Sequence, residues 1–330
     1  MASDDFDERA VLGDELQQRG DPLGELIGLQ VALEQLPASV PVVRRRLIER
    51  KIAAHLDAHH DALYGALAPH VTRSSRPDLF DPALHVKAWR GGFADAIWVQ
   101  VTRSGLTLVE ILGALRTLPI ARFIRRLELG LGDQPAAIAE LVRAPIATLR
   151  ELVVDETSRP LPMLGRARLT ELAPIEPLLD QLELLQVLSS VNYRRFASST
   201  LRTLTLWLPV HATFTPATTR FDADLPALED LTASGFLFDV DVVARYPRLR
   251  RLALSGWYEP GWLAHLLRSP QLARLERLEL GWRFTDDDLE LLVRSADQLG
   301  HLTLCDVSAN AFSRAARAAA RARLPACVRL

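Results

Sequence analysis

The sequence has few cysteines: Cys305 and Cys327 are the only two among its 330 residues. Two thiols are too few for the disulfide framework that holds many small secreted domains together. The chain begins with the acidic segment MASDDFDER, whereas a secretion signal begins with basic residues and continues with apolar ones. We therefore expect two free thiols, a reducing compartment and a cytoplasmic protein.

The sequence also lacks a long apolar segment and an excess of one charge. It has no run of about 18 uncharged apolar residues, the length that a transmembrane helix needs. Lys and Arg number 39 and Asp and Glu number 41, which leaves a net charge of -2. Such a balance provides no general attraction to nucleic acid or to an anionic membrane surface. We expect neither of them as a partner.

Motifs of common catalytic and metal sites are missing as well. The nucleophile motif G-x-S-x-G and the phosphate-binding loop G-x-x-x-x-G-K do not occur. His55 and His59 would share a helical face, but no cysteine or glutamate pair nearby completes a zinc site. His301 and Cys305 are expected outward on one strand, about 13 Å apart, which is too far for the histidine to activate the thiol. We expect no metal, no cofactor and no enzyme activity.

A leucine pattern, in contrast, is abundant. Leu249, Leu252 and Leu254 have the spacing L-x-x-L-x-L, which places Leu252 and Leu254 on one side of a short strand. Apart from the interval between Leu149 and Leu201, neighbouring copies start between 21 residues (Leu228 to Leu249) and 27 residues (Leu201 to Leu228) apart. The other copies are Ile124/Leu127/Leu129, Leu149/Leu152/Val154, Leu201/Leu204/Leu206, Leu228/Leu231/Ala233, Leu275/Leu278/Leu280 and Leu299/Leu302/Leu304.

This spacing and period resemble the leucine-rich-repeat family. The resemblance implies an α/β solenoid, an arc with a parallel sheet inside and helices on its convex side. Many of these repeats carry an asparagine five residues after the second leucine, and its amide satisfies turn carbonyls. Because none occurs at these places, we expect an irregular arc; the residues found there are Gly132, Thr157, Pro209, Phe236, Trp257, Arg283 and Val307.

The series has one gap: the copies that start at Leu149 and Leu201 are 52 residues apart, which is the length of two repeats. The missing strand could contain Leu179/Leu182/Leu184 or Leu169/Leu172. We favour the first trio, because Pro174 and Pro177 would interrupt a strand that continues from the second.

The ends of the repeat series and the segments between strands complete this prediction. Phe93, Ala96 and Trp98 keep the spacing with aromatic residues and indicate an atypical first repeat. A helix with arginines on one side, residues 314–321, is expected to cap the other end. Between strands, apolar residues at steps of three or four predict helical segments at 106–118, 136–142, 240–245, 262–267 and 286–295.

The first 70 residues have helical rather than repeat character. Asp21 followed by Pro22 predicts a helix start, and Pro37 predicts its end. A second helix is expected from Val42 to His55, and a third, shorter one continues to Leu67. The R-G-D-P turn that ends at Pro22 and the following E-L-I-G-L-Q segment resemble the bacterial repeat-companion domain. We therefore predict a helical domain at 1–70, a linker at 71–84 and a leucine-rich-repeat domain at 85–330.

The outward residues of the repeat strands are the candidate binding site, because the inward ones form the core. They mix both charges with arginine and tryptophan, which often anchor protein interfaces. A simpler interpretation is that these charges only keep the sheet soluble. The predicted partner-binding residues are Arg126, Glu128, Glu151, Thr203, Thr205, Trp207, Asp230, Arg251, Arg277, Glu279 and His301.

Two functional hypotheses follow. In the first, the chain is a non-catalytic scaffold or adaptor that binds a protein partner on the concave face of the arc. In the second, it is a recognition or regulatory subunit that docks on a partner enzyme through its N-terminal helical domain. The sequence does not identify the partner or the oligomeric state.

Overall fold

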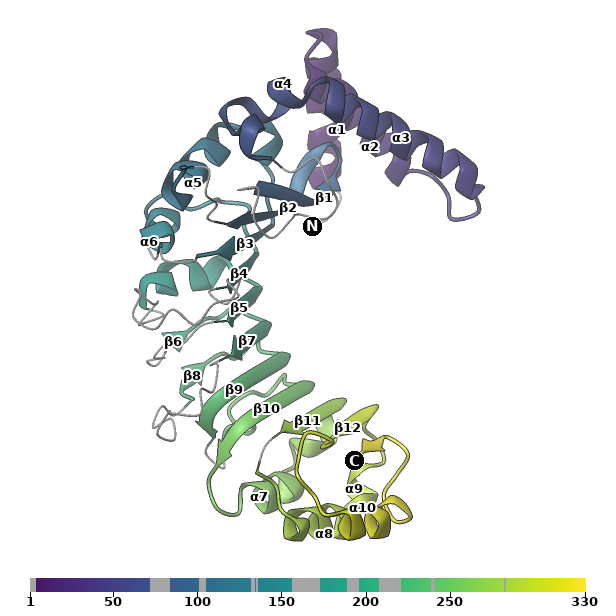
Figure 1. The fold of residues 1–330 in the computed structure, drawn as a ribbon, viewed down its shortest axis with the longest axis vertical. Coiled ribbons are helices and arrows are strands. Elements are labelled where there is room, and N and C mark those ends of the chain that lie inside the picture. Colours follow the sequence, from purple (N-terminus) through teal and green to yellow (C-terminus); the bar gives the residue numbers. More distant parts are fainter. Residues whose placement is uncertain are drawn as a thin grey trace. The chain divides into compact units, whose positions relative to one another are not determined.

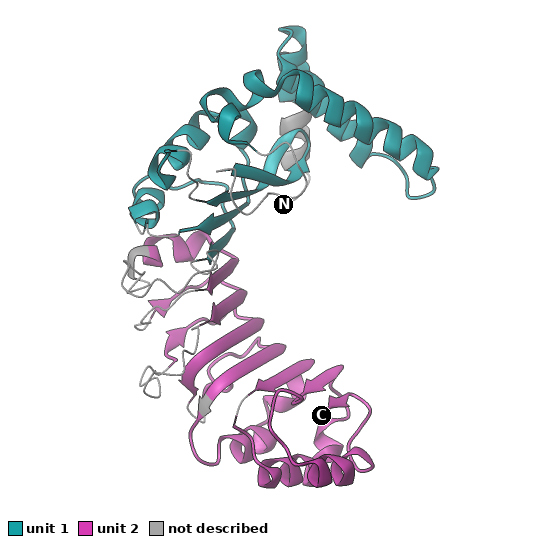
Figure 2. Ribbon diagram, viewed as in Figure 1, with its two compact units in different colours: residues 1–162 teal, residues 163–330 magenta. Residues whose placement is uncertain are grey.

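The chain forms two compact units, residues 1–162 and 163–330 (Figure 2). The computed structural model describes residues 4–71, 84–100, 105–131, 134, 136–155, 173–188, 196–207, 221–238, 241–281 and 283–330. Each unit contains a mostly parallel sheet with helices, an α/β arrangement (Figure 1). In the described part of the chain, no helix is both long enough and apolar enough to cross a membrane.

The first unit begins with helices, as predicted. They are α1 (Asp4–Gln18), α2 (Pro22–Glu34), α3 (Val42–Ala58), α4 (His60–Tyr64) and the 3-10 helix η1 (Gly65–His70).

The R-G-D-P turn joins α1 to α2 by a simple mechanism. Gly20 has a φ of +71° and ends α1 in the left-handed region, where glycine is not strained. Asp21 then caps α2, since its Oδ1 accepts a hydrogen bond of 2.9 Å from the backbone N–H of Leu23. Pro22 occupies the first turn, where no N–H is needed. The predicted helix start is confirmed.

The sheet of the first unit has the order β1-β2-β3-β4. β1 (Leu84–Arg90) and β2 (Phe93–Gln100) form an antiparallel hairpin, and β3 (Arg126–Gly130) and β4 (Glu151–Asp155) follow in parallel. Two helices, α5 (Leu108–Thr117) and α6 (Ala136–Arg143), and the 3-10 helix η2 (Pro119–Ala121) lie between the strands along the chain. Both helices agree with the predicted segments at 106–118 and 136–142.

The predicted side-chain directions in the first repeat are wrong by one residue. Ile97 and Val99 align with the core residues Leu127 and Leu129 of β3, whereas Trp98 aligns with Glu128 on the other side of the sheet. A shift of one residue along a strand turns every side chain to the opposite face. The aromatic pattern was misleading because β2 buries residues on both sides.

The helices of the first unit pack directly on this hairpin. Gly92 in the hairpin turn has a φ of +83°, and a Cβ there would lie 2.5 Å from the Cα of Ile27 in α2. The neighbouring N–H of Gly91 donates a hydrogen bond of 2.7 Å to Oε1 of Glu34. Helices and first strands thus belong to one compact unit. The predicted domain boundary at 71–84 stays a prediction, and residues 72–83 of that linker lie outside the described residues.

The second unit contains a parallel sheet of order β5-β7-β9-β10-β11-β12-β13. The strands are β5 (Leu184–Leu188), β7 (Thr203–Trp207), β9 (Asp230–Phe238), β10 (Arg251–Tyr258), β11 (Arg277–Gly281), β12 (Leu304–Asp306) and β13 (Val328–Arg329). The short strands β6 (Phe196–Ala197) and β8 (Ala223–Asp224) pair separately. The helices are α7 (Trp262–Arg268), α8 (Asp286–Arg294), α9 (Ala296–Leu299) and α10 (Arg314–Arg321), with 3-10 helices η3 (Ala173–Gln181) and η4 (Leu272–Arg274).

Four predicted strands of the second unit have the expected register. The second leucines of their trios, Leu204, Leu231, Leu252 and Leu278, align side by side across β7, β9, β10 and β11. All four are buried, as expected if each strand turns its leucine side to the core.

Two trios were predicted three residues too early. In β5, Leu185 aligns with Leu204, so the trio is Leu182/Leu185/Val187 rather than Leu179/Leu182/Leu184. In β12, Cys305 aligns with Leu278, so the trio is Leu302/Cys305/Val307 rather than Leu299/Leu302/Leu304. The first error arose because both trios in this leucine-rich stretch fit the spacing, and the second because cysteine and valine replace leucine in the core.

In the corrected register the last repeat carries an asparagine at the position where the predicted register has Val307. Asn310 lies five residues after Cys305 and is buried. Its Nδ2 donates hydrogen bonds of 2.7 Å to the carbonyl of Leu280 and 3.0 Å to that of Val307, and its Oδ1 accepts from the N–H of Phe284. The side-chain amide therefore satisfies turn groups of two successive repeats.

The segments between strands in the second unit are partly helical. α7 and α8 confirm the segments predicted at 262–267 and 286–295, and α10 confirms the expected last helix. The helix predicted at 240–245 is wrong, because residues 241–245 form turns. β9 extends to Phe238 and Pro247 precedes β10, so only a short segment joins these two strands.

The corrected register predicts different costs for two adjacent leucines. Leu185→Ala should lower the free energy of unfolding by about 2–5 kcal/mol, because it leaves a cavity in the core. Leu184→Ala should cost less than about 1 kcal/mol, because Leu184 lies on the outward side and is only half-buried. Urea unfolding of both variants measures the difference. A larger loss for Leu184→Ala would mean that the original trio is correct.

Candidate interaction surface

The predicted outward residues of the second unit form two rows across the sheet. Thr203, Asp230, Arg251 and Arg277 align on β7, β9, β10 and β11. The next row, two residues further along each strand, contains Thr205, Thr232, Ala253 and Glu279. Strand alternation explains both rows, since the leucines between them face the core. We call these residues, together with Trp207, the outward face of the second unit.

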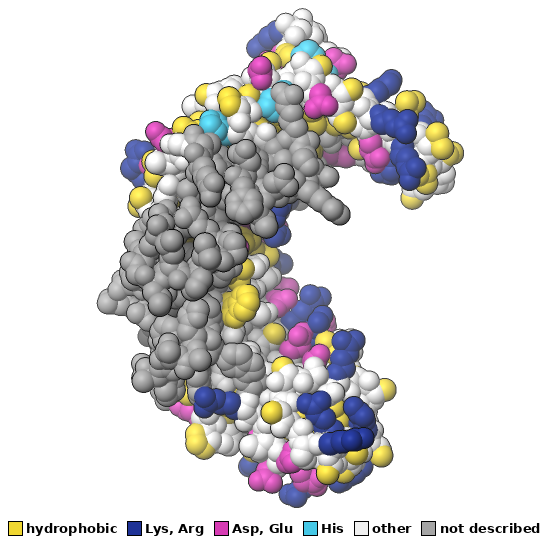
Figure 3. Space-filling view, viewed as in Figure 1, with side chains coloured by type: hydrophobic (Ala, Val, Ile, Leu, Met, Phe, Trp, Pro, Cys, Tyr) yellow, Lys and Arg dark blue, Asp and Glu magenta, His cyan; other side chains and the backbone are white. Residues whose placement is uncertain are grey.

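Charges of both signs are neighbours on this face. Arg251 Nη1 lies 3.7 Å from Asp230 Oδ2, and Arg277 Nε lies 2.6 Å from Glu279 Oε1. Figure 3 shows basic and acidic side chains interspersed over the strands of this unit. Both arginines remain largely exposed, so these pairs contribute little to stability. Their guanidinium groups are accessible to a partner.

Asp230 is the charged residue of this face whose environment disfavours ionisation. Its side chain is half-buried, and burial raises the pKa of its carboxyl above the ordinary value of 3.8. Arg251 and Arg277 oppose this rise in pKa, whereas Glu279 adds to it. The carboxylate therefore lies in a place that does not favour its charge.

Trp207 adds an apolar side chain to the same face. It ends β7, aligns with Ser234 of β9 and is 50% exposed. Tryptophan exposed beside threonines and arginines is a composition that favours protein binding. The structure therefore confirms the predicted outward position of Trp207.

The outward residues of the first unit form an ionic network. Arg126 of β3 contacts two carboxylates, Glu128 Oε1 at 2.9 Å through its Nε and Glu151 Oε2 at 3.2 Å through its Nη1. Glu128 is buried and also accepts a hydrogen bond from the Nζ of Lys87. Lys87 was not among the predicted site residues, because no local pattern in the sequence indicates that β1 pairs with β2 as a hairpin. Arg126, Glu128 and Glu151 lie together on the outward side of the strands, but Glu128 is buried there and not exposed as predicted.

His301 does not lie in the predicted row. It precedes β12, and its Nε2 lies 2.9 Å from the carbonyl oxygen of Leu272. The register of β12 places Leu304 beside Arg277 and Asp306 beside Glu279 instead. The error has the same cause as the misplaced trio, a shift of three residues.

Cys305 is also placed differently from the prediction. Its side chain faces the core rather than solvent, and burial raises the pKa of the thiol to about 12. Cys327 is half-buried, and its thiol lies 3.4 Å from the carbonyl oxygen of Leu299. A thiol with so high a pKa is a poor nucleophile at neutral pH.

The histidines near the end of α3 have structural contacts. His55 is buried, with Nε2 at 2.7 Å from the carbonyl oxygen of Pro22 and Nδ1 at 3.5 Å from Glu25 Oε2. Its ring centroid is 4.5 Å from that of His59. Within the described ranges, no group of three or more His, Cys, Asp or Glu side chains could hold a metal ion.

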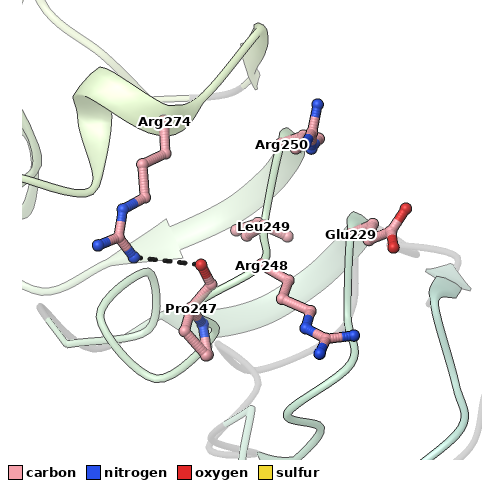
Figure 4. Close-up of a pocket in the computed structure, with 6 residues that line it drawn as sticks. All are labelled: Glu229, Pro247, Arg248, Leu249, Arg250 and Arg274. Carbon is pink, nitrogen blue, oxygen red and sulfur yellow. Dashed lines mark hydrogen bonds between the residues drawn. The ribbon is translucent and has the colours of Figure 1, made fainter.

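A hollow of about 580 Å³ lies where the chain enters β9 and β10. Arg274 Nη1 donates a hydrogen bond of 3.2 Å to the carbonyl of Pro247, and Arg250 Nη1 pairs with Glu276 Oε1 at 2.7 Å. The guanidinium groups point in different directions and do not converge on one point (Figure 4). The hollow therefore lacks the geometry of an anion site; its lining residues are Glu229, Pro247, Arg248, Leu249, Arg250 and Arg274.

Comparisons with known proteins add little. No protein-family model and no curated protein matches the chain. Among solved structures, a protein from Bacteroides fragilis is similar, with 16% sequence identity and a TM-score of 0.48. The alignment covers 68% of this chain and 70% of that one. A similarity of this size carries no argument about function.

Asp230→Asn tests the cost of the half-buried carboxylate. Because the folded-state pKa is raised, ionisation of Asp230 opposes folding at every pH above that pKa. The variant should therefore melt at a higher temperature than the parent at pH 7. The difference should shrink as the pH falls through the folded-state pKa and vanish below 3.8. A variant that melts at a lower temperature than the parent at pH 7 would show instead that Arg251 and Arg277 stabilise the charge.

Thiol labelling tests the position of Cys305. With Ellman's reagent at pH 8, we expect one thiol, Cys327, to react in the folded protein and the second to react only after unfolding. The Cys327→Ser variant should then show no rapid reaction. Rapid labelling of that folded variant would place Cys305 in contact with solvent.

Proposed function

We propose that this protein is a non-catalytic scaffold or adaptor that binds a protein partner through the outward face of its parallel sheet. In this proposal the sheet belongs to an irregular leucine-rich-repeat solenoid, and the outward face is its concave side. A reducing, cytoplasmic environment would suit its two free cysteines.

The observation that carries this proposal is the strict separation of the two sides of the strands. In the second unit, inward positions of β7, β9, β10 and β11 repeat leucine in register with one alanine, whereas outward positions vary among threonine, aspartate, arginine, alanine and glutamate. A core requires the first side only, so the second is free to serve recognition. Exposed Arg251, Arg277 and Trp207 provide residue types that anchor interfaces.

Asn310 supports the leucine-rich-repeat interpretation. In the corrected register it occupies the position at which that family carries its asparagine, and it makes the turn hydrogen bonds expected there. The N-terminal helices are proposed to be a repeat-companion domain, because the R-G-D-P turn forms the helix junction that the resemblance implies.

A charge-reversal pair tests the outward face. The intact chain and an Arg251→Glu/Arg277→Glu variant are used for affinity capture from lysate of the source organism. A partner of the outward face should be retained by the intact chain and reduced at least about tenfold by the variant, because two anchoring cations become anions.

The matched control is Arg314→Glu/Arg321→Glu on α10. Both arginines are exposed, and neither pairs with another residue in the described part of the chain. Thermal melting confirms that each variant is folded. Equal capture by both variants and the parent would exclude the outward face of the second unit as the binding surface.

A further inference from the structure

The first half of α3 has no role in the core of its unit. Only Ile52 and His55 of this helix are buried, and both belong to its second half. From Val42 to Lys51 every side chain is exposed except Ile48, which is half-buried. In Figure 1 this end of the helix extends away from the rest of the first unit. A segment so exposed has little packing to stabilise it.

The local sequence does not stabilise this helix end either. Pro41 provides no side-chain cap, and the first turn contains no acidic residue. Instead Arg44, Arg45 and Arg46 follow within the first two turns, where the positive end of the helix dipole disfavours cations. A nearby negative charge would offset this repulsion. The arginines at this end of the helix would therefore be stabilised by an acidic binding partner.

Two aliphatic side chains lie between these cations. Val43 is 79% exposed and Leu47 is 54% exposed, and a spacing of four residues places them on one side of the helix. At 100° per residue, Arg46 and Arg50 flank this pair on one side and Lys51 on the other. Figure 3 shows basic and hydrophobic side chains together at this end of α3.

The flanking cations are available for binding. Arg44, Arg46, Arg50 and Lys51 form no hydrogen bond or ion pair through their side chains with any residue that the structure describes. Glu49 is the one acidic residue of this half of the helix. We call Val43, Leu47 and these four cations the basic-aliphatic surface of α3.

We propose that the basic-aliphatic surface of α3 docks an amphipathic helix of a partner protein, in which an aliphatic stripe is flanked by Asp and Glu. Two helices side by side would bury Val43 and Leu47 against that stripe and place carboxylates opposite the arginines. Charge complementarity identifies the flanks of the partner and the exposed aliphatic pair identifies its centre. This inference does not depend on the outward face of the sheet.

Other anionic partners fit these residues less well. Nucleic acid would neutralise the cations, but its backbone would leave the aliphatic pair uncovered, and this half of α3 has no aromatic residue on which a base could stack. Helices that lie on membranes commonly insert Trp, Phe and several Leu residues. Val43 and Leu47 provide much less apolar area than that.

Binding of designed helices to the full chain tests the proposal. The probe is a fluorescent peptide of three heptads with leucine at positions a and d and glutamate at e and g. Its controls are the same peptide with lysine at e and g and a scrambled peptide of the same composition. Fluorescence anisotropy should show binding of the acidic helix alone, weakened by added salt.

Two variants separate the contributions of charge and of the aliphatic pair. Arg44→Glu/Arg46→Glu/Arg50→Glu and Val43→Ser/Leu47→Ser should each weaken binding of the acidic helix by about tenfold or more. The Arg314→Glu/Arg321→Glu variant should bind within about twofold of the parent. Thermal melting should be nearly unchanged, because the substituted side chains are exposed and form no pair with the residues that the structure describes.

Several results would overturn the proposal. They are no binding of the acidic helix, an unchanged affinity of the Val43→Ser/Leu47→Ser variant, or tighter binding of duplex DNA or of phosphatidylglycerol vesicles that depends on the same arginines. Self-association of the chain that Arg44→Glu/Arg46→Glu/Arg50→Glu abolishes, measured by sedimentation, would assign the surface to a second copy instead. None of these results bears on the outward face of the sheet.

Discussion

The structure depends on burying one side of each strand against the strands beside it. In the second unit, each strand contributes a core leucine that aligns with those of the adjacent strands: Leu204, Leu231, Leu252 and Leu278. These leucines pack against one another and form a core that no single strand could form alone. This alignment also orders the other side of the sheet, because side chains alternate along a strand. The outward residues are therefore neighbours because the core leucines align, and not because the outward residues attract one another.

The exposed surfaces contain charges that the fold does not need. Asp230 is half-buried on the outward face, where burial raises the pKa of its carboxyl. The first half of α3 carries cations near the positive end of a helix dipole, with no acidic cap. Both arrangements cost stability in the isolated chain. Such local conflicts are typical of residues that serve binding rather than folding.

Local leucine spacing does not fix the register of every strand. Where leucines are frequent, two copies of the pattern L-x-x-L-x-L can overlap. Leu182 fits both Leu179/Leu182/Leu184 and Leu182/Leu185/Val187, and only the second trio agrees with the register of β5. In β12, Cys305 replaces the leucine, which moved the predicted strand by three residues and carried His301 onto the face of the sheet. Because of the same shift, the predicted register placed Val307 at the asparagine position. In the structure that position is occupied by Asn310, which hydrogen-bonds turn carbonyls of two successive repeats.

The sequence by itself determined most strands, the helix that starts at Asp21 and the inward side of four repeats, because capping and strand alternation act between residues close in the chain. Tertiary structure alone decided the exact register of β2, β5 and β12, the pairing of Lys87 with Glu128, and the exposure of the first half of α3. These features depend on which distant segment lies alongside, and neither periodicity nor propensity contains that information.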